Sequence, residues 1–169
     1  MNQYWFSPLT ITEMVDELEE NATSIAFLST PSVYFSLRSD KLRKNSRLFD
    51  YDDMWANDPG FVKYNYKDLQ TIPAELHHKF DYVVIDPPFV TDLVWEKYAA
   101  AAKLVLAWRP KGKFLGCTIP EHNWLLRQIL DASLCNFRPS IPNLLYQYSF
   151  YTNYESPRFM TYNPEIDPE

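Results

Sequence analysis

Glycine is scarce in this sequence. Gly60, Gly112 and Gly116 are the only glycines among 169 residues, and none of them precedes residue 60. A glycine-rich loop, which lets the backbone approach a bound ligand closely, is therefore absent from the N-terminal part of the chain. Any binding loop in that part must use other small side chains, backbone amides and the start of a helix instead.

Cysteine is also scarce, and long apolar runs are missing. Cys117 and Cys135 lie in apolar segments without paired spacing, which indicates free buried thiols in a reduced intracellular compartment rather than a disulfide framework. No apolar run approaches the length of a membrane span, and we expect no signal peptide. We therefore expect a cytoplasmic protein.

Positive charge and histidine are also in short supply. The chain has 16 Lys and Arg against 22 Asp and Glu, which gives a net charge of −6 and a pI of about 5.1. A protein that binds a polyphosphate backbone normally has a basic face, so this balance disfavours stable nucleic-acid binding except through a local basic patch. His77 and His78 are adjacent, His122 is distant, and no Cys, His or acid cluster surrounds them, so we expect no metal site.

Apolar residues, by contrast, are abundant. Hydrophobic residues make up 46% of the chain and aromatic residues 17%, which excludes disorder over most of its length. A chain of 169 residues fits one compact domain, and we expect a single domain over residues 1–169. Its polar, proline-punctuated end, residues 155–169, is predicted to be a loosely held tail.

Short apolar runs of strand length alternate with segments of helical pattern. Strands are predicted at 24–30, 46–52, 61–66, 81–86 and 113–119, and helices at 9–20, 31–39, 95–108 and 120–133. Two further strands, at 135–140 and 144–154, could pair with each other. This order predicts an α/β fold, Rossmann-like and seven-stranded, with a mostly parallel sheet and an antiparallel C-terminal strand. The connection at 53–60 is short for a crossover helix.

The most apolar of these strands ends in Asp86, Pro87, Pro88 and Phe89. Ligands of open α/β sheets bind beyond the carboxyl ends of the strands, and Asp86 occupies such an end. The two prolines fix φ and remove two amide donors, which leaves carbonyl oxygens free to face a ligand, and Phe89 adds a flat wall. The tetrapeptide is therefore predicted to cradle an amino group, the alternative being an ordinary proline-rich turn.

The tetrapeptide resembles the Asp/Asn-Pro-Pro-Tyr/Phe signature of enzymes that methylate the 6-amino group of adenine. The chain as a whole resembles the eukaryotic lysine methyltransferases of translation elongation factor 1-alpha, which are adenine-methylase-like. Five segments carry this second resemblance, at residues 3–7, 29–37, 48–52, 81–89 and 146–156. Phe89 departs from the usual tyrosine of that family by losing a hydroxyl, and the acidic helical extension often found ahead of the aromatic motif is absent.

The resemblance implies S-adenosylmethionine as cofactor. The loop at Ser29, Thr30 and Pro31 would then replace the usual glycines, the alternative being an ordinary strand-to-helix turn. A carboxylate that ends the second strand is placed to accept the ribose hydroxyls; Asp50 and Asp52 are the candidates, and Asp50, the first acid of the triplet, is favoured.

Two further pairs of residues are candidates by their position. Asn65 and Tyr66, which end the third strand, could contact the cofactor's adenine, although turn residues explain them equally well. The resemblance implies that Trp5 and Phe6 clasp the substrate, the alternative being simple packing.

Three functions are compatible with these residues. The first is an S-adenosylmethionine-dependent protein-lysine methyltransferase acting on elongation factor 1-alpha, and the second is an adenine methyltransferase of DNA or RNA. The third is a cofactor-binding scaffold without turnover. The intact Asp86-Pro87-Pro88 argues against the scaffold. The small size and acidic charge, and the absence of a separate target-recognition domain, argue against the nucleic-acid enzyme.

Overall fold

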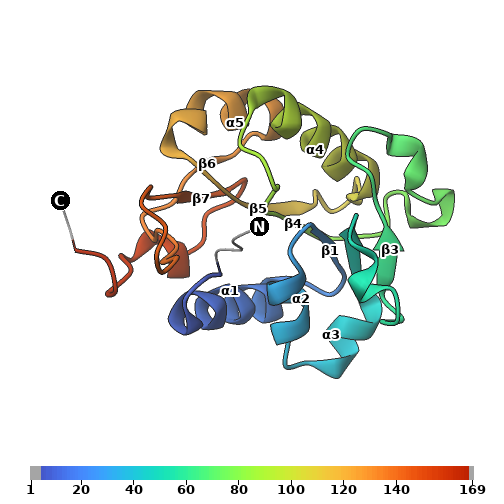
Figure 1. Ribbon diagram of the computed structural model, residues 1–169, viewed down its shortest axis with the longest axis horizontal. Helices are drawn as coiled ribbons and strands as arrows, with labels where there is room; N and C mark the ends of the chain where they lie inside the picture. Colours follow the sequence, from blue (N-terminus) through green and yellow to red (C-terminus); the bar gives the residue numbers. More distant parts are fainter. Residues whose placement is uncertain (1–4, 168–169) are drawn as a thin grey trace.

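A seven-stranded sheet lies between two layers of helices in the computed structural model, which describes residues 5–167 (Figure 1). The strands occur in the order β3-β2-β1-β4-β5-β7-β6. Their bounds are β1 Ile25–Leu28, β2 Arg47–Asp50, β3 Phe61–Lys63, β4 Tyr82–Ile85, β5 Lys113–Thr118, β6 Ser133–Leu134 and β7 Ser149–Thr152. β1 to β5 are parallel, and β7 runs antiparallel to both β5 and β6. The predicted fold class, with its antiparallel C-terminal strand, is confirmed.

The helices are divided between the two faces of the sheet. α1 Pro8–Asn21, α2 Pro31–Ser36 and α3 Asp40–Asn45 cover one face, and α4 Asp92–Val105 and α5 Asn123–Leu130 cover the other (Figure 1). Short 3-10 helices occur in the connections and the C-terminal segment, at Asp53–Trp55, Leu69–Thr71, Ala74–Leu76, Pro120–His122 and Arg158–Met160. The layering follows from the strands, which are apolar on both sides and need cover on both.

The central strands show this two-sided burial clearly. All four residues of β1 are fully buried. Because side chains alternate across a strand, Ile25 and Phe27 pack under α1 and α2, whereas Ala26 and Leu28 pack under α4. β4 is equally buried and pairs with β1 in register, Leu28 opposite Ile85. This pair sets the level at which the two strands end.

Several predicted boundaries are wrong, each for a local reason. The helix expected at 95–108 begins three residues earlier because the Thr91 side chain accepts the Val94 amide at 3.3 Å and caps it. The helix expected at 31–39 ends at Ser36, and a second helix, α3, begins only at Asp40, where the Ser39 side chain caps it by accepting the Leu42 amide at 3.1 Å.

The strands near the C-terminus also differ from the prediction. Residues 135–140 form no strand; β6 instead comprises Ser133–Leu134, directly after α5, which ends at Leu130. Asp131 there adopts a left-handed conformation (φ 53°), so the chain reverses sooner than a continuous helix to residue 133 would allow. β7 occupies only four residues of the predicted 144–154.

The connection between β2 and β3 holds no α-helix, as its length suggested. A single 3-10 turn suffices because the two strands are edge neighbours. The Tyr34 hydroxyl donates to Asp58 Oδ2 at 2.6 Å and would lie 2.2 Å from a Cβ at Gly60. Glycine is required there by this close approach.

The C-terminal segment is packed rather than loose, contrary to the prediction. Phe159 is 1% exposed and joins the core under α1, and Ser156 and Asn163 are buried. The Asn163 side chain donates to the Arg138 carbonyl at 2.8 Å. Residues 156–163 therefore form part of the folded structure.

Both cysteines are free thiols, Cys117 buried and Cys135 half-buried. Within residues 5–167, no helix has both the length and the apolar character needed to cross a bilayer. The cytoplasmic location stays a prediction.

Candidate functional site

Three of the predicted residues leave the sheet side by side. Leu28, the last residue of β1, pairs with Phe49 on one side and with Ile85 on the other. Ser29, Asp50 and Asp86 come next in their strands and therefore lie at the same level along one edge. This edge is the carboxyl end of the parallel strands, where ligands of such sheets bind.

The turn after β1 shows how the chain manages without glycine. Ser29 has φ 61°, a left-handed conformation that L-residues rarely adopt. Its amide donates to the Phe49 carbonyl at 2.8 Å, and its hydroxyl is 2.7 Å from the Tyr98 hydroxyl. These bonds hold the strained turn, which leads through Thr30 into α2 at Pro31.

Thr30 has a feature that points to a ligand. The residue is 3% exposed, and its Oγ1 is buried without a hydrogen-bond partner in the described part of the chain. A buried hydroxyl is normally bonded, so an unused one beside a strained turn marks a place where a bound group could supply the partner.

The two candidate acids after β2 differ in their surroundings. Asp50 is partly buried, and burial raises the pKa of its carboxyl. Its Oδ1 accepts the Asp52 amide at 2.8 Å, which leaves the second oxygen to the site. Asp52 is exposed, and its Oδ1 caps the following 3-10 turn by accepting the Met54 amide at 2.9 Å. Asp50 is thus better placed than Asp52 to face a ligand.

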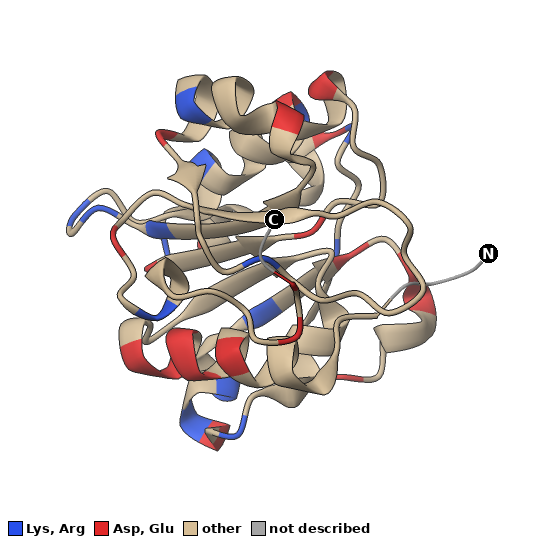
Figure 2. Ribbon diagram, turned by 90° about the vertical axis from the view of Figure 1, so that its left-hand side faces the viewer, with Lys and Arg blue, Asp and Glu red and all other residues tan. Residues whose placement is uncertain are grey.

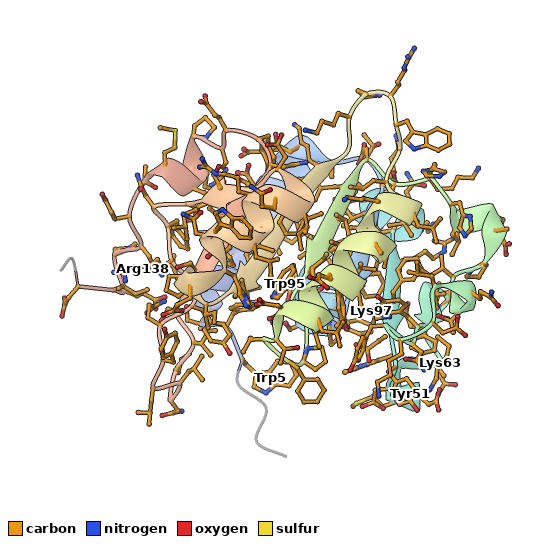
Figure 3. The ribbon with its side chains drawn as sticks, turned by 90° about the horizontal axis from the view of Figure 1, so that it is seen from above. Trp5, Tyr51, Lys63, Trp95, Lys97 and Arg138 are labelled. Carbon is orange, nitrogen blue, oxygen red and sulfur yellow. The ribbon has the colours of Figure 1, made fainter. Side chains whose placement is uncertain are left out.

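Beside these acids, Tyr51 lies exposed at the surface. The Lys63 Nζ sits 4.3 Å from the centroid of its ring, and Figure 3 shows the two side chains together at one edge of the molecule. The amine also donates to Asp53 Oδ1 at 3.0 Å. This cation closes the outer side of the turn after β2.

Asn65 and Tyr66 separate into different roles. The Asn65 Oδ1 accepts the Lys67 amide at 3.0 Å, so this side chain stabilises a turn. The Tyr66 ring stacks on Tyr98 with centroids 5.7 Å apart and 26° between the ring planes. Because Tyr98 also contacts Ser29, Tyr66 belongs to the edge where the turn after β1 lies, and the Asn65 side chain bonds to the backbone.

Asp86 is the most unusual carboxylate of this edge. It is partly buried, its amide donates to the Leu28 carbonyl at 3.4 Å, and burial raises the pKa of its carboxyl to about 7. No hydrogen bond to its carboxyl oxygens forms among residues 5–167. Pro87 is buried, whereas Pro88 and Phe89 are exposed, Phe89 by 56%. An acid with a raised pKa, free oxygens and an aromatic ring beside it suits the binding of an amino group.

Two tyrosines near Asp86 were not predicted as site residues. Burial raises the pKa of both Tyr98 and Tyr148, and the Asp86 carboxylate adds to the rise in each. Burial and the same carboxylate also raise the pKa of Cys117. In the sequence these residues stand in ordinary apolar segments, and no local signal separates them from core tyrosines.

Trp5 and Phe6 are divided between surface and core. Phe6 packs on Phe150 of β7, with ring centroids 6.1 Å apart, so packing explains it. Trp5 is 49% exposed and lies at the same edge of the molecule as Tyr51 in Figure 3. Gln3 and Tyr4, which complete the predicted aromatic motif, lie outside the described residues.

The histidines have separate local partners. His78 Nδ1 is 2.9 Å from the Leu106 carbonyl and His77 Nε2 is 3.3 Å from that of Ile72, whereas His122 lies between Thr118 and Asp92. In the described part of the chain, no three His, Cys, Asp or Glu side chains gather as a metal site would require.

The chain is similar in sequence to known methyltransferases. The sequence model of a family described as "Probable N6-adenine methyltransferase" matches residues 1–156. The chain belongs to this family. A zebrafish (Danio rerio) relative, EEF1A lysine methyltransferase 1, is 33% identical over 171 residues, covering 92% of this chain and 98% of the relative. The bovine (Bos taurus) protein of that name is 31% identical over 168 residues, covering 92% and 70%.

A solved methyltransferase structure supports the fold of this family member. The 1,6-didemethyltoxoflavin-N1-methyltransferase of Burkholderia thailandensis, solved with S-adenosylhomocysteine, aligns with a TM-score of 0.53 at 14% identity. The alignment covers 86% of this chain and 76% of that one. At this identity the likeness shows a shared fold alone. The chain is therefore a methyltransferase by family, and its sheet is that of the class I enzymes.

Proposed function

We propose that this methyltransferase transfers a methyl group from S-adenosylmethionine to a lysine of translation elongation factor 1-alpha. The observation that carries the proposal is the Asp86 carboxyl, which directly follows β4 and has free oxygens and a raised pKa. It stands in a chain that is similar over 92% of its length to proteins named EEF1A lysine methyltransferase 1. We infer the substrate from those names and the chemistry from the geometry at the edge of the sheet.

The residues at the strand ends fit S-adenosylmethionine. The left-handed turn at Ser29 brings the backbone close, and the unpaired Thr30 hydroxyl offers a hydrogen bond. The free Asp50 oxygen can accept from ribose hydroxyls, and the Tyr66 ring can contact the adenine. When bound, the cofactor supplies an electrophilic methyl group on a sulfonium. Pro31 continues this loop into α2.

The amine would be held by the tetrapeptide. Asp86 and the Pro87 carbonyl accept its N–H bonds and orient the nitrogen lone pair, while Phe89 and Trp5 form aromatic walls that exclude water. Pro88 keeps the loop extended by fixing φ. These groups align the nitrogen without forming a covalent bond to it.

A lysine must lose a proton before it can attack. The pKa of a free lysine is about 10.4, so proton transfer to a group with the pKa of Asp86, about 7, costs about 4 to 5 kcal/mol. An ordinary carboxyl would make the same transfer about twice as costly. The approaching ammonium lowers the pKa of Asp86, so we infer that the proton leaves through the cleft to water and Asp86 orients the neutral amine.

The family description favours a second candidate, methylation of the 6-amino group of adenine in DNA or RNA. That amine is neutral, so Asp86 would only need to accept its N–H bonds. The acidic net charge and the similarity to lysine enzymes over 92% of the chain favour the lysine function over this candidate.

One labelling experiment separates the two. The purified protein is incubated with methyl-labelled S-adenosylmethionine and, in parallel, with elongation factor 1-alpha, total RNA and single- and double-stranded DNA. We expect label on the elongation factor, mapped by mass spectrometry to a lysine, and none with the Asp86→Ala control. Nuclease-sensitive label without label on the factor would establish the adenine function instead.

A further inference from the structure

A chain of buried polar contacts links α4 to the end of β5. Trp95 Nε1 donates to Thr118 Oγ1 at 3.0 Å, Thr118 Oγ1 is 3.0 Å from His122 Nδ1, and His122 Nε2 is 3.1 Å from Asp92 Oδ1. Trp95 and Thr118 are fully buried and His122 is 5% exposed. Figure 3 shows Trp95 on the side of α4 that faces α5.

The donors in this chain are fixed by its two ends. An indole nitrogen can only donate, so the Thr118 oxygen accepts from Trp95, and the Asp92 carboxylate can only accept, so His122 Nε2 carries a hydrogen and donates to it. In the neutral imidazole Nδ1 is then an acceptor, and the Thr118 hydroxyl donates to it. Thr118 Oγ1 thus both accepts and donates, and these contacts hold the imidazole in one orientation.

The chain ends at the proposed catalytic loop. Asp92 is the first residue of α4 and follows directly on residues 86–91. Thr118 is the last residue of β5, the strand that pairs with β4. The upstream end of the loop is fixed by β4 and by the bond from the Asp86 amide to Leu28. The bond from His122 to Asp92 fixes its downstream end to the neighbouring strand.

We propose that His122 and Asp92 are positioning residues, which hold the tetrapeptide loop at the distance from β5 that methyl transfer requires. The proposal rests on the proposed role of residues 86–89. The Asp92 side chain is 75% exposed, so its burial contributes little to stability. The effect of its contact with the buried His122 is instead to hold the start of α4 in place. Because the two prolines make the loop stiff, a shift at residue 92 is transmitted to Phe89 and to the Pro87 carbonyl rather than absorbed.

Three variants of α4 test the proposal. Asp92→Ala removes the acceptor of the His122 hydrogen bond, and Asp92→Asn removes the charge but keeps an oxygen acceptor. Glu96→Ala removes an acid from the same helix as a matched control. Glu96 lies one turn further along at an exposed position, and within residues 5–167 its side chain makes no hydrogen bond or ion pair. Asparagine is the poorer helix former, so a recovery by Asp92→Asn reports the acceptor and not helix propensity.

Two readouts are measured for each variant. In methylation kinetics, we expect Asp92→Ala to lower kcat by about 2- to 10-fold, which corresponds to one lost hydrogen bond, with KM for S-adenosylmethionine within about twofold. In hydrogen exchange, we expect faster exchange of the Trp95 amide, which donates to the Thr91 carbonyl at 3.1 Å. Asp92→Asn should restore both values, and Glu96→Ala should match the wild type.

The outcomes distinguish this proposal from the proposed function. Equal kcat and equal exchange in Asp92→Ala and the wild type would overturn the positioning role while leaving the methyltransferase activity intact. Equal loss in Asp92→Ala and Asp92→Asn would overturn it too, because charge and not the hydrogen bond would then be responsible. If the wild type methylates neither protein nor nucleic acid, the proposed function fails, and the exchange of the Trp95 amide still decides whether Asp92 anchors the loop.

Discussion

At Asp86, the stability of the fold and the proposed function of the residue oppose each other. Burial raises the pKa of its carboxyl to about 7, whereas the pKa of an aspartate in an unfolded chain is about 3.9. The folded protein therefore holds a proton there between about pH 4 and pH 7 that the unfolded chain has already lost. Above about pH 7 the native state must bury the charge, at a cost of roughly 4 kcal/mol at most.

We expect Asp86→Asn to stabilise the fold in a pH-dependent way. Below about pH 4 the wild-type carboxyl is protonated in both states, so the two proteins should have similar free energies of unfolding. As pH rises to about 8 the wild type alone is progressively destabilised, and the variant should become more stable by a few kcal/mol. Urea denaturation at several pH values measures the difference. A difference that does not change with pH would contradict the buried-charge explanation.

Ser29 is the second residue at which the local conformation is costly. A left-handed conformation is unfavourable for an L-residue by about 1 to 2 kcal/mol, and glycine would avoid that penalty. Serine adds the contact between its Oγ and the Tyr98 hydroxyl at 2.7 Å, which glycine could not make. The strain is therefore offset by a bond that ties the loop to α4.

At the scale of elements, α1 and the C-terminal segment form a charged contact around a buried acid. Glu17 of α1 is 2% exposed, and its Oε1 accepts from the Tyr154 hydroxyl at 2.8 Å and from Asn21 Nδ2 at 3.0 Å. Arg158 Nε lies 3.4 Å from Glu17 Oε2, and its Nη1 lies 3.1 Å from Glu13 Oε2. This arginine neutralises the buried carboxylate and holds residues 156–163 on α1.

Arg158→Met should therefore destabilise the protein. Without the arginine, the Glu17 carboxylate is buried without a counter-charge, and the free energy of unfolding should fall by about 1 to 3 kcal/mol. Adding Glu17→Gln should recover part of the loss because the uncompensated charge is gone. Arg38→Met is the matched control, since Arg38 pairs with Asp16 and Glu19 of the same helix but its side chain is 59% exposed. Chemical denaturation compares all four proteins.

The control defines what would contradict this account. Because exposed ion pairs contribute little, Arg38→Met should leave the denaturation midpoint almost unchanged. Equal destabilisation by the two arginine variants would mean that the number of ion pairs matters here and the burial of Glu17 does not.

At the scale of the whole molecule, acidic charge is concentrated on the outer side of α1. Glu13, Asp16, Glu19 and Glu20 belong to this helix, and Figure 2 shows its acidic residues in a row. Arg38 and Arg158 pair with these acids and offset part of their charge. The negative charge that remains, together with the net charge of −6, attracts a basic protein surface at long range and repels a phosphate backbone. This charge distribution affects how fast the protein and its substrate meet, and it does not affect the proposed chemistry at Asp86.

The substrate prediction therefore includes a salt dependence. We expect kcat/KM for elongation factor 1-alpha to fall several-fold as ionic strength rises from about 50 to about 300 mM, because screening weakens long-range attraction. The S-adenosylmethionine affinity, measured by calorimetry over the same range, should change much less and serves as the control. A rate that is constant or rises with salt would show that the acidic surface plays no part in substrate capture.

The sequence by itself determined the fold class and which residues follow the strand ends at the edge of the candidate site. Apolar runs broken by acids and prolines are local patterns, so they predicted the parallel strands and placed Asp86, Asp50 and Ser29 at strand ends. The resemblance to the lysine methyltransferases agrees with the family to which the chain belongs. Helix ends were less predictable, because a cap such as Thr91 can begin a helix several residues ahead of its apolar pattern.

Only the tertiary structure decided which side chains meet at that edge. Tyr98 and Tyr148 come close to Asp86 from distant segments, and Asp50 is distinguished from Asp52 by burial and by the amide that each accepts. The C-terminal segment was predicted to be a loose tail because its own sequence is polar. Its Arg158, however, pairs with acids of α1 and holds the segment on that helix. These features depend on contacts between residues far apart in the chain, and local propensity carries no information about such contacts until the sheet has brought them together.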